Sequence, residues 1–444
     1  MIRTLLSASA ALALCLPAAA ADLNEAVEAD YEYLEALYEH FHQNPELSFQ
    51  ETETAKRLAK ELRKAGYDVT SGVGGTGIVA VMENGEGPTV MLRADMDGLP
   101  VEEQTGLPYA SEARGPNRDG EMFPTMHACG HDVHMTSLVG AARQLAERTD
   151  DWSGTLILIG QPAEELGLGA LAMIEDGLYE RFLTPDYVVG LHDSASLPAG
   201  SISYTPGWAL ANVDSVDIRV KGIGGHGAYP HTTKDPIVIA SQIVNNLQTL
   251  VSRELSPLDR AVVTVGAFNA GSKHNIISDE AHLQLTVRSF DDATREKLLS
   301  GIARIARAQA VSAGLPEELM PVVEVEEPYT PSTFNDPDLT QRIAGVFREQ
   351  FGEDRVQEAP PVMGGEDFSQ FGRTPEDVPA VIFWVGAVEP ERFAAAQDGG
   401  DALPSLHSPF FAPDPRPTLT TGVEAMTAAA LDLLGKPASQ RAGD

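Results

Sequence analysis

Short apolar runs rich in β-branched residues recur along the chain, and stretches with helical spacing of apolar residues separate them. The strand-like runs cover 78–82, 89–92, 155–159 and 187–191, and the helical patterns cover 23–41, 55–65 and 132–148. Short continuous apolar runs are typical of strands buried on both faces. Parallel strands need a crossover connection, which is usually a helix. This order therefore predicts an α/β fold of three layers, in which helices cover both faces of a central, mostly parallel sheet.

The pattern changes near residue 210. Val216, Ile218 and Val220 alternate with polar residues, as in a strand with one solvated face. A helix over 236–250, strands near 261–268 and 281–289 and a helix near 294–313 follow. This β-α-β-β-α-β order resembles a ferredoxin-like unit and predicts an inserted α+β domain. We expect the larger domain at 22–208 and 323–437, the inserted domain at 209–322, and a tail at 438–444.

The charge of the chain excludes two classes of partner. Its 444 residues include 65 acidic and 31 basic side chains, for a formal net charge of −34. Nucleic acids are bound mainly by Lys and Arg, and so are anionic membrane surfaces. We therefore expect neither a nucleic acid nor a membrane as partner.

The N-terminus has the composition of an export signal. Arg3 precedes an apolar stretch over 5–16, and the small residues Ala18, Ala19 and Ala20 follow. This pattern predicts a cleaved signal peptide over 1–21 and a periplasmic or secreted protein, although a buried N-terminal helix has a similar composition. Cleavage leaves Cys129 as the only cysteine, so an internal disulfide is excluded.

The densest group of metal-ligand side chains lies at 126–134. Cys129 and His131 are two residues apart, and a thiolate with an imidazole suits zinc and other late first-row divalent ions. Taken alone, the same residues are compatible with histidines in the first turns of a helix.

Further candidates follow the predicted strands. Glu164 and Glu165 come after the strand at 155–159, His192 follows the strand at 187–191, and His407 lies near the C-terminus. Ligands collect outside the carboxyl ends of parallel strands. Of two adjacent carboxylates, one can bind a metal while the other accepts and donates protons. An acidic pair at a helix N-terminus is the simpler explanation of Glu164 and Glu165 alone, but the combination favours a metal site.

Seven motifs occur in an order that resembles the aminoacylase and hippurate-hydrolase family, which includes the indoleacetyl–amino-acid hydrolases and related carboxypeptidases of the dinuclear-metal peptidase clan MH. The motifs are RADMDGLP (93–100), MHACGHDVH (126–134), QPAEE (161–165), GLH (190–192), GGHGAYPH (224–231), GGEDFS (364–369) and LHSPFF (406–411). The resemblance covers about residues 30–435.

The resemblance implies a role for each matching residue. The five metal ligands are Cys129, His131, Glu165, His192 and His407. They would bind two divalent ions, for which zinc, manganese, cobalt and nickel all suit the mixed ligand set. Glu164 would be the general base towards a metal-bridged water.

The resemblance also implies roles outside the ligand set. Asp97 would orient a ligand, and Asp95 is a weaker candidate for the same role. His226 of the inserted domain would stabilise the oxyanion, in some relatives across a homodimer. Asn275 and Arg288 would hold the polar end of the substrate, unless they are ordinary surface residues of a strand. The inserted domain would then serve as a lid and a dimerisation domain.

The leading hypothesis is an exported amidohydrolase that cleaves N-acyl amino acids or related small amides. A dipeptidase or carboxypeptidase would use the same residues. A periplasmic metal- or solute-binding protein would need ligands but no base, so Glu164 argues against it. A metal-independent thiol hydrolase using Cys129 would not need Glu165, His192 and His407 together.

Overall fold

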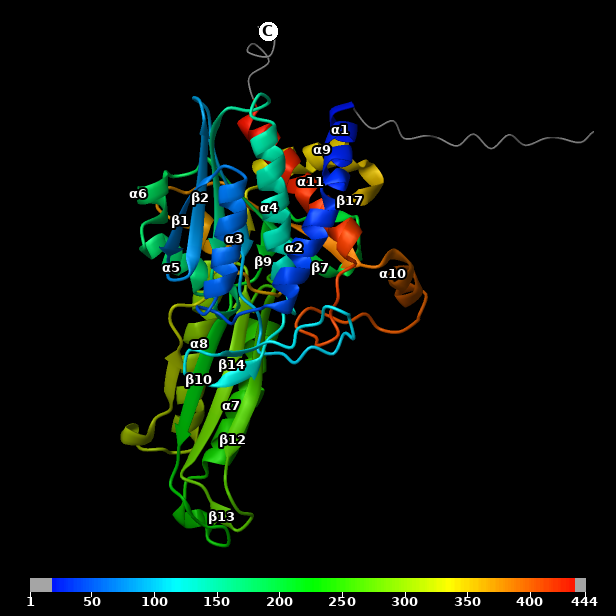
Figure 1. Cartoon of the computed structure of the whole chain (residues 1–444). Helices are drawn as coiled ribbons and strands as arrows, with labels where there is room; N and C mark the ends of the chain where they lie inside the picture. Colours follow the sequence, from blue (N-terminus) through cyan, green and yellow to red (C-terminus); the bar gives the residue numbers. More distant parts are fainter. Residues whose placement is uncertain (1–17, 436–444) are drawn as a thin grey trace, which may run out of the picture.

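The computed structural model describes residues 18–435. The expected tail at 438–444 and residues 1–17 of the expected signal peptide lie outside this range. The chain forms a larger domain and a narrower inserted domain that projects from it (Figure 1). Within residues 18–435, no helix combines the length and the apolar character needed to span a membrane.

The larger domain is built around one sheet of eight strands. Their order across the sheet is β1-β2-β6-β3-β7-β18-β8-β17. The neighbours β6, β3, β7 and β18 run parallel, as do β8 and β17, and the other contacts are antiparallel. The predicted mostly parallel sheet is thus confirmed. The strands span Asp68–Val73 (β1), Gly77–Asn84 (β2), Thr89–Asp95 (β3), Gly154–Gln161 (β6), Tyr187–Pro198 (β7), Ile202–Tyr204 (β8), Val356–Glu358 (β17) and Ala380–Val388 (β18).

Helices cover both faces of this sheet, which confirms the three layers. The central strands β3 and β6 are buried along nearly their whole length, which is why their sequences are continuous apolar runs. One face is covered by Ala18–Ala29 (α1), Tyr31–Gln43 (α2), Thr52–Lys64 (α3), His131–Glu147 (α4), Pro337–Phe351 (α9) and Pro415–Leu434 (α11). The other face is covered by Gly169–Glu175 (α5), Leu178–Phe182 (α6) and the 3₁₀ helix Asp367–Gly372.

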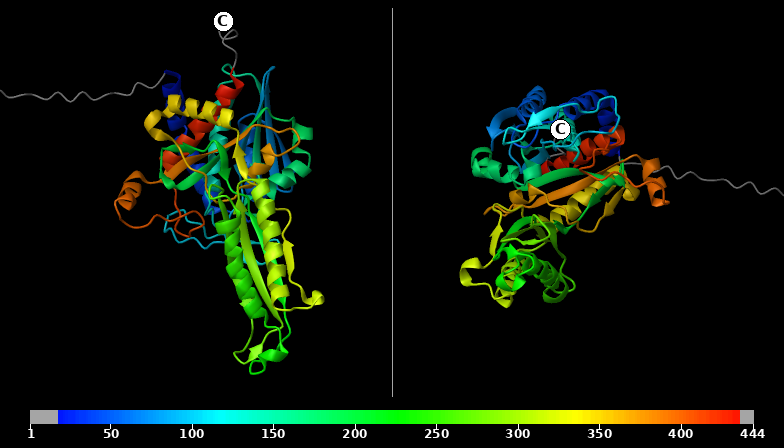
Figure 2. Two further views of the ribbon diagram at one scale, coloured as in Figure 1. Left: turned by 180° about the vertical axis from the view of Figure 1, so that it is seen from behind. Right: turned by 90° about the horizontal axis from the view of Figure 1, so that it is seen from below.

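The inserted domain has the predicted ferredoxin-like order. Its four antiparallel strands lie in the order β12-β14-β10-β15, and its two helices pack on one side of the sheet (Figure 2). The elements are Asp214–Lys221 (β10), Pro236–Thr249 (α7), Ala261–Ala270 (β12), Glu280–Ser289 (β14), Asp292–Ser312 (α8) and Val322–Val325 (β15). Because β15 pairs with β10, the insertion extends beyond its expected end at 322.

The two connections to the inserted domain lie side by side. The Val213 amide donates to the Thr330 carbonyl at 2.8 Å, and this bridge closes the neck of the insertion.

Two helices differ from the sequence prediction. The helix expected over 23–41 is divided into α1 and α2 at Asp30, whose carboxylate binds Arg143. A short helix, Pro390–Gln397 (α10), begins before the loop expected at 394–404 because Glu389 caps its first amides.

Candidate metal centre

The candidate ligands gather at one edge of the large sheet. β3 ends at Asp95, the neighbouring β6 ends at Gln161, and β7 carries His192 just after its buried start. Since these strands are parallel, the segments that follow them meet at the same edge. The loop that holds His407 reaches this edge from the other end of the sequence.

The structure brings all five predicted ligands together. His407 Nε2 lies 3.3 Å from Cys129 Sγ and 3.6 Å from Glu165 Oε2. Cys129 Sγ lies 3.6 Å from His192 Nε2. His131 Nε2 lies 3.9 Å from Glu165 Oε1. These contacts form overlapping groups of three whose ligand atoms lie within 4.8 Å of one another, so the cluster can hold more than one ion.

A glycine sets the positions of Cys129 and His131. Gly130 has φ of 76° at the start of α4, a left-handed conformation that glycine adopts without strain. A Cβ atom at Gly130 would lie 2.3 Å from the carboxylate of Asp193. Only glycine fits this turn, which presents the thiol before it and the imidazole after it to the same centre.

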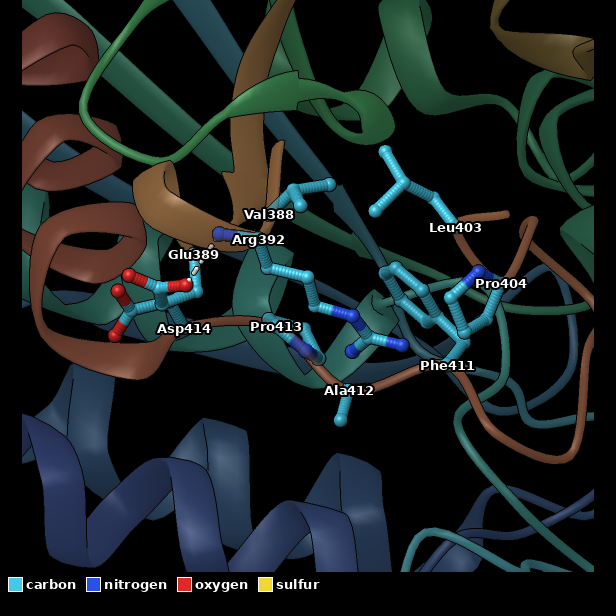
Figure 3. A pocket seen from close by; sticks show the side chains of 9 residues that line it. All are labelled: Val388, Glu389, Arg392, Leu403, Pro404, Phe411, Ala412, Pro413 and Asp414. Atoms are coloured by element: carbon cyan, nitrogen blue, oxygen red, sulfur yellow. Dashed lines mark hydrogen bonds between the residues drawn. The ribbon is translucent and has the colours of Figure 1, made fainter. Parts of the chain in front are cut away.

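The His407 loop is tied to the rest of the site by its backbone. His407 has a φ of 66°, and its amide donates to the carbonyl of Ala128 at 2.8 Å. Phe411, 2% exposed, packs the loop against Met126. A separate cavity of about 200 Å³ lies beside this loop, and Arg392 extends across it towards Phe411 (Figure 3). None of the five candidate ligands lines this cavity.

The donor set fits divalent cations. Among the described residues, both imidazole nitrogens of His131 and Oε1 of Glu165 are buried without a hydrogen-bond partner. Burial raises the pKa of Glu165 to about 8, and burial together with Glu366 raises the pKa of Glu164 well above its usual range. Unpartnered buried acceptors are costly, and a cation would satisfy them. Sulfur, nitrogen and oxygen donors together suit zinc, manganese, cobalt or nickel.

Glu164 and Asp97 both lie beside the candidate ligand His131. The side chain of Glu164 is 9% exposed, and Oε2 lies 3.8 Å from His131 Nε2. Asp97 accepts the backbone amides of Glu164 and Glu165, each at 3.1 Å, and its Oδ1 lies 3.3 Å from His131 Nδ1. Asp97 therefore holds the backbone of the two glutamates and lies beside the candidate ligand His131.

The sequence predicts no firm role for four buried residues near the centre, namely Arg93, Asp95, His134 and Asp193. Asp95 binds His134 Nδ1 at 2.6 Å and the guanidinium of Arg93 at 2.7 Å. His134 Nε2 accepts the amide of Asp193 at 2.9 Å. His134 thus links β3, α4 and β7 behind the ligands. His134 follows His131 by three residues in a helix, and residues at this spacing share a helix face. The sequence therefore indicated that the two imidazoles lie close together.

A large cavity opens from the metal centre. Its volume is about 680 Å³, and it reaches from Glu164 and the ligands to Arg288 on β14. Its lining includes the apolar side chains Leu166, Leu168, Leu210, Val213, Val362, Trp384 and Leu406, and also the charged side chains Arg118, Glu326, Glu327 and Glu366. Arg288 donates to the Met363 carbonyl at 2.9 Å, and no carboxylate among the described residues is paired with it. Burial lowers the pKa of Arg288.

His226 and Asn275 are not brought to this centre within the chain. His226 lies in the short strand Gly225–His226 (β11), which pairs with Ile276–Ile277 (β13) at the far end of the inserted domain (Figure 1). The Gly227 amide donates to the Asn275 carbonyl at 2.8 Å, so the two residues are neighbours. Neither lines the large cavity. Of the three residues expected in the inserted domain, only Arg288 lies at the site.

Known proteins share this sequence and fold. Residues 91–412 match the model of peptidase family M20/M25/M40. The hippurate hydrolase of Campylobacter jejuni is 40% identical over 76% of this chain and 84% of its own length. An N-acetylcysteine deacetylase of Bacillus subtilis is 36% identical over 78% of this chain and 86% of its own length.

A solved structure extends the likeness to the arrangement of the two domains. A dinuclear metal-binding M20 peptidase of Bacillus subtilis superimposes with a TM-score of 0.74 at 30% identity, over 92% of this chain and 99% of that chain. The predicted enzyme class, a metal-dependent hydrolase of amide or peptide bonds, is confirmed. The chain belongs to peptidase family M20/M25/M40.

Proposed function

We propose that this protein is an exported amidohydrolase that cleaves the amide bond of N-acyl amino acids. The observation that carries the proposal is one cavity whose lining includes Glu164, four of the five candidate ligands, Arg288 and several apolar side chains. An N-acyl amino acid has a carboxylate that Arg288 could bind, an amide that Glu164 and the candidate ligands could bind, and an acyl group that the apolar side chains could contact. Export rests on the composition of residues 1–21. The activities named for two relatives, hippurate hydrolase and N-acetylcysteine deacetylase, support this substrate class.

The residues of the chain divide the reaction between them. Cys129, His131, Glu165, His192 and His407 would hold two divalent cations, which when bound make water acidic and polarise a carbonyl. Glu164 accepts the proton of the attacking water and returns it to the leaving nitrogen. Among the described residues Arg288 forms no ion pair, although Glu326, Glu327 and Glu366 line the same cavity, so its guanidinium can pair with the carboxylate of the substrate.

The first test is hydrolysis of a panel of substrates by the purified protein. We expect N-acyl amino acids with apolar acyl groups to be cleaved, activity to be lost with a chelator, and activity to return when a divalent metal is restored. Dipeptides in the panel distinguish the carboxypeptidase alternative from the proposed function. Activity that survives complete metal removal, or a metal-loaded protein that hydrolyses none of the panel, would overturn the proposal.

We also propose that the protein is a homodimer through the inserted domain and that His226 acts across it. α7 and β12 contain no charged residue, although the chain as a whole is strongly acidic. β12 is an edge strand, and Val238 and Phe268 on these elements are 52% and 40% exposed. An uncharged surface beside an unpaired edge is suited to a second copy. A second copy could bring its own His226 to this site.

The dimer has two measurable consequences. Val238→Glu with Phe268→Glu should halve the molar mass measured by light scattering, whereas Val311→Glu, 58% exposed on α8, should leave it unchanged. Mixing inactive His226→Ala protein with inactive Glu164→Gln protein should restore activity, because each mixed dimer contains one complete site. A monomeric wild-type protein, or no activity in the mixture after subunit exchange, would contradict the arrangement.

A further inference from the structure

The turn that presents Glu164 has an unusual backbone. Ala163 lies between the end of β6 and the 3₁₀ helix Glu164–Leu166, is fully buried and has a φ of 48°. An alanine in this left-handed region is strained because its Cβ atom meets the backbone. Such strain persists only where the surroundings impose the conformation.

Two buried carboxylates impose it. Asp97 accepts the amides of Glu164 and Glu165 at 3.1 Å each. Glu51, in the turn before α3, accepts the amide of Ala163 at 2.9 Å, although the two residues are 112 positions apart. Three consecutive amides of the turn are thus held by two side chains, that of Ala163 by Glu51 and those of Glu164 and Glu165 by Asp97.

Glu51 is fixed in turn by its own contacts. Its side chain is fully buried, and the same Oε1 that binds Ala163 also accepts the amide of Phe49 at 2.9 Å. Its Oε2 accepts the hydroxyl of Thr76 at 2.5 Å. A buried carboxylate without these donors would be strongly destabilising, so its place against Ala163 is well determined.

We propose that Glu51 is a positioning residue that holds the strained turn at Ala163 and thereby aims the carboxylate of Glu164. The inference rests on the proposed function, which makes Glu164 the base. Without the Glu51 contact, Ala163 can relax towards negative φ. This change would rotate the backbone of Glu164 and turn its carboxylate away from its present direction. Glu165 has a second restraint, its place in the ligand cluster, whereas Glu164 depends on its backbone. The main effect therefore falls on kcat.

Two conservative variants separate position from charge. Glu51→Asp keeps the charge but withdraws the carboxylate from Ala163, so kcat should fall about 10- to 100-fold with KM nearly unchanged and metal content retained. Glu51→Gln loses the charge but keeps an oxygen within reach of the amide, so kcat should stay within about threefold of wild type. Glu46→Ala removes a carboxylate that caps α3 through the amides of Glu53 and Thr54, and should leave kcat unchanged.

A second-site change tests the strain directly. Glycine adopts positive φ without strain, so Ala163→Gly should restore at least part of the kcat lost in Glu51→Asp. The inference is overturned if Glu51→Gln is as slow as Glu51→Asp, if Glu46→Ala is equally slow, or if the loss is in metal content or KM. A wild-type protein without metal-dependent hydrolysis would refute the proposed function instead, and this is measured first.

Discussion

Replacing Glu164 by glutamine is expected to reduce kcat by about 10²–10⁴-fold, the contribution typical of a general base. Glutamine has nearly the same shape as glutamate but cannot accept the proton of water. The side chain lies 3.8 Å from His131 and is adjacent to the candidate ligand Glu165. Because Glu164 is not one of the five candidate ligands, metal content should be retained. The measurement is kcat together with metal content per chain.

Glu165→Gln is the matched control for this prediction. It changes the neighbouring side chain by the same single atom, but it should lower metal content because Glu165 lies among His131, Cys129 and His407. If Glu164→Gln loses metal while Glu165→Gln keeps metal and loses turnover, the two roles are exchanged.

Arg93→Met should destabilise the larger domain by about 3–5 kcal/mol. The guanidinium of Arg93 is fully buried and binds Asp95 and Glu366 at 2.7 Å each. Removing it leaves Glu366 and Asp367, which lies 3.6 Å from Arg93, buried without a counter-charge, and leaves Asp95 with His134 as its remaining hydrogen-bond partner. Methionine fills a similar volume, so the loss in free energy of unfolding reflects the removed charge and not a new cavity.

Tryptophan fluorescence in denaturant can follow this unfolding selectively. Trp152, Trp208 and Trp384 all lie in the larger domain, so they do not report on the inserted domain. The control is Lys56→Met in α3 of the larger domain, whose ion pair with Glu53 is exposed and should contribute less than about 1 kcal/mol. Equal losses in the two variants would show that the buried network contributes no more than a surface pair.

Much of the fold was predictable because its signals are local. β3 and β6 are buried on both faces, and their apolar runs show it directly. β10 alternates in burial along its length, as one covered face requires. The marginal strands β1 and β17 were not predicted, because they are short and partly exposed, and only their neighbours in the sheet make them strands.

The candidate site was also predictable only where its signals are local. The candidate ligands lie within short motifs, so their residue types and order were informative. The contact of Glu51 with Ala163 and the contact of Arg93 with Glu366 join segments far apart in the sequence, and no local pattern reports them. His226 illustrates a third case. Its motif suggested a role, but only the structure shows that it lies away from the centre of its own chain.

The position of β18 determines when the molecule can be completed during synthesis. β18 lies between β7 and β8 in the middle of the large sheet, yet it is made after the whole inserted domain. A nascent chain that ends before Ala380 therefore exposes an apolar, unpaired edge of β7. The inserted domain is continuous in sequence and can form its core first. The larger domain must wait for its last quarter, and until then this edge is the part of the nascent chain most exposed to aggregation.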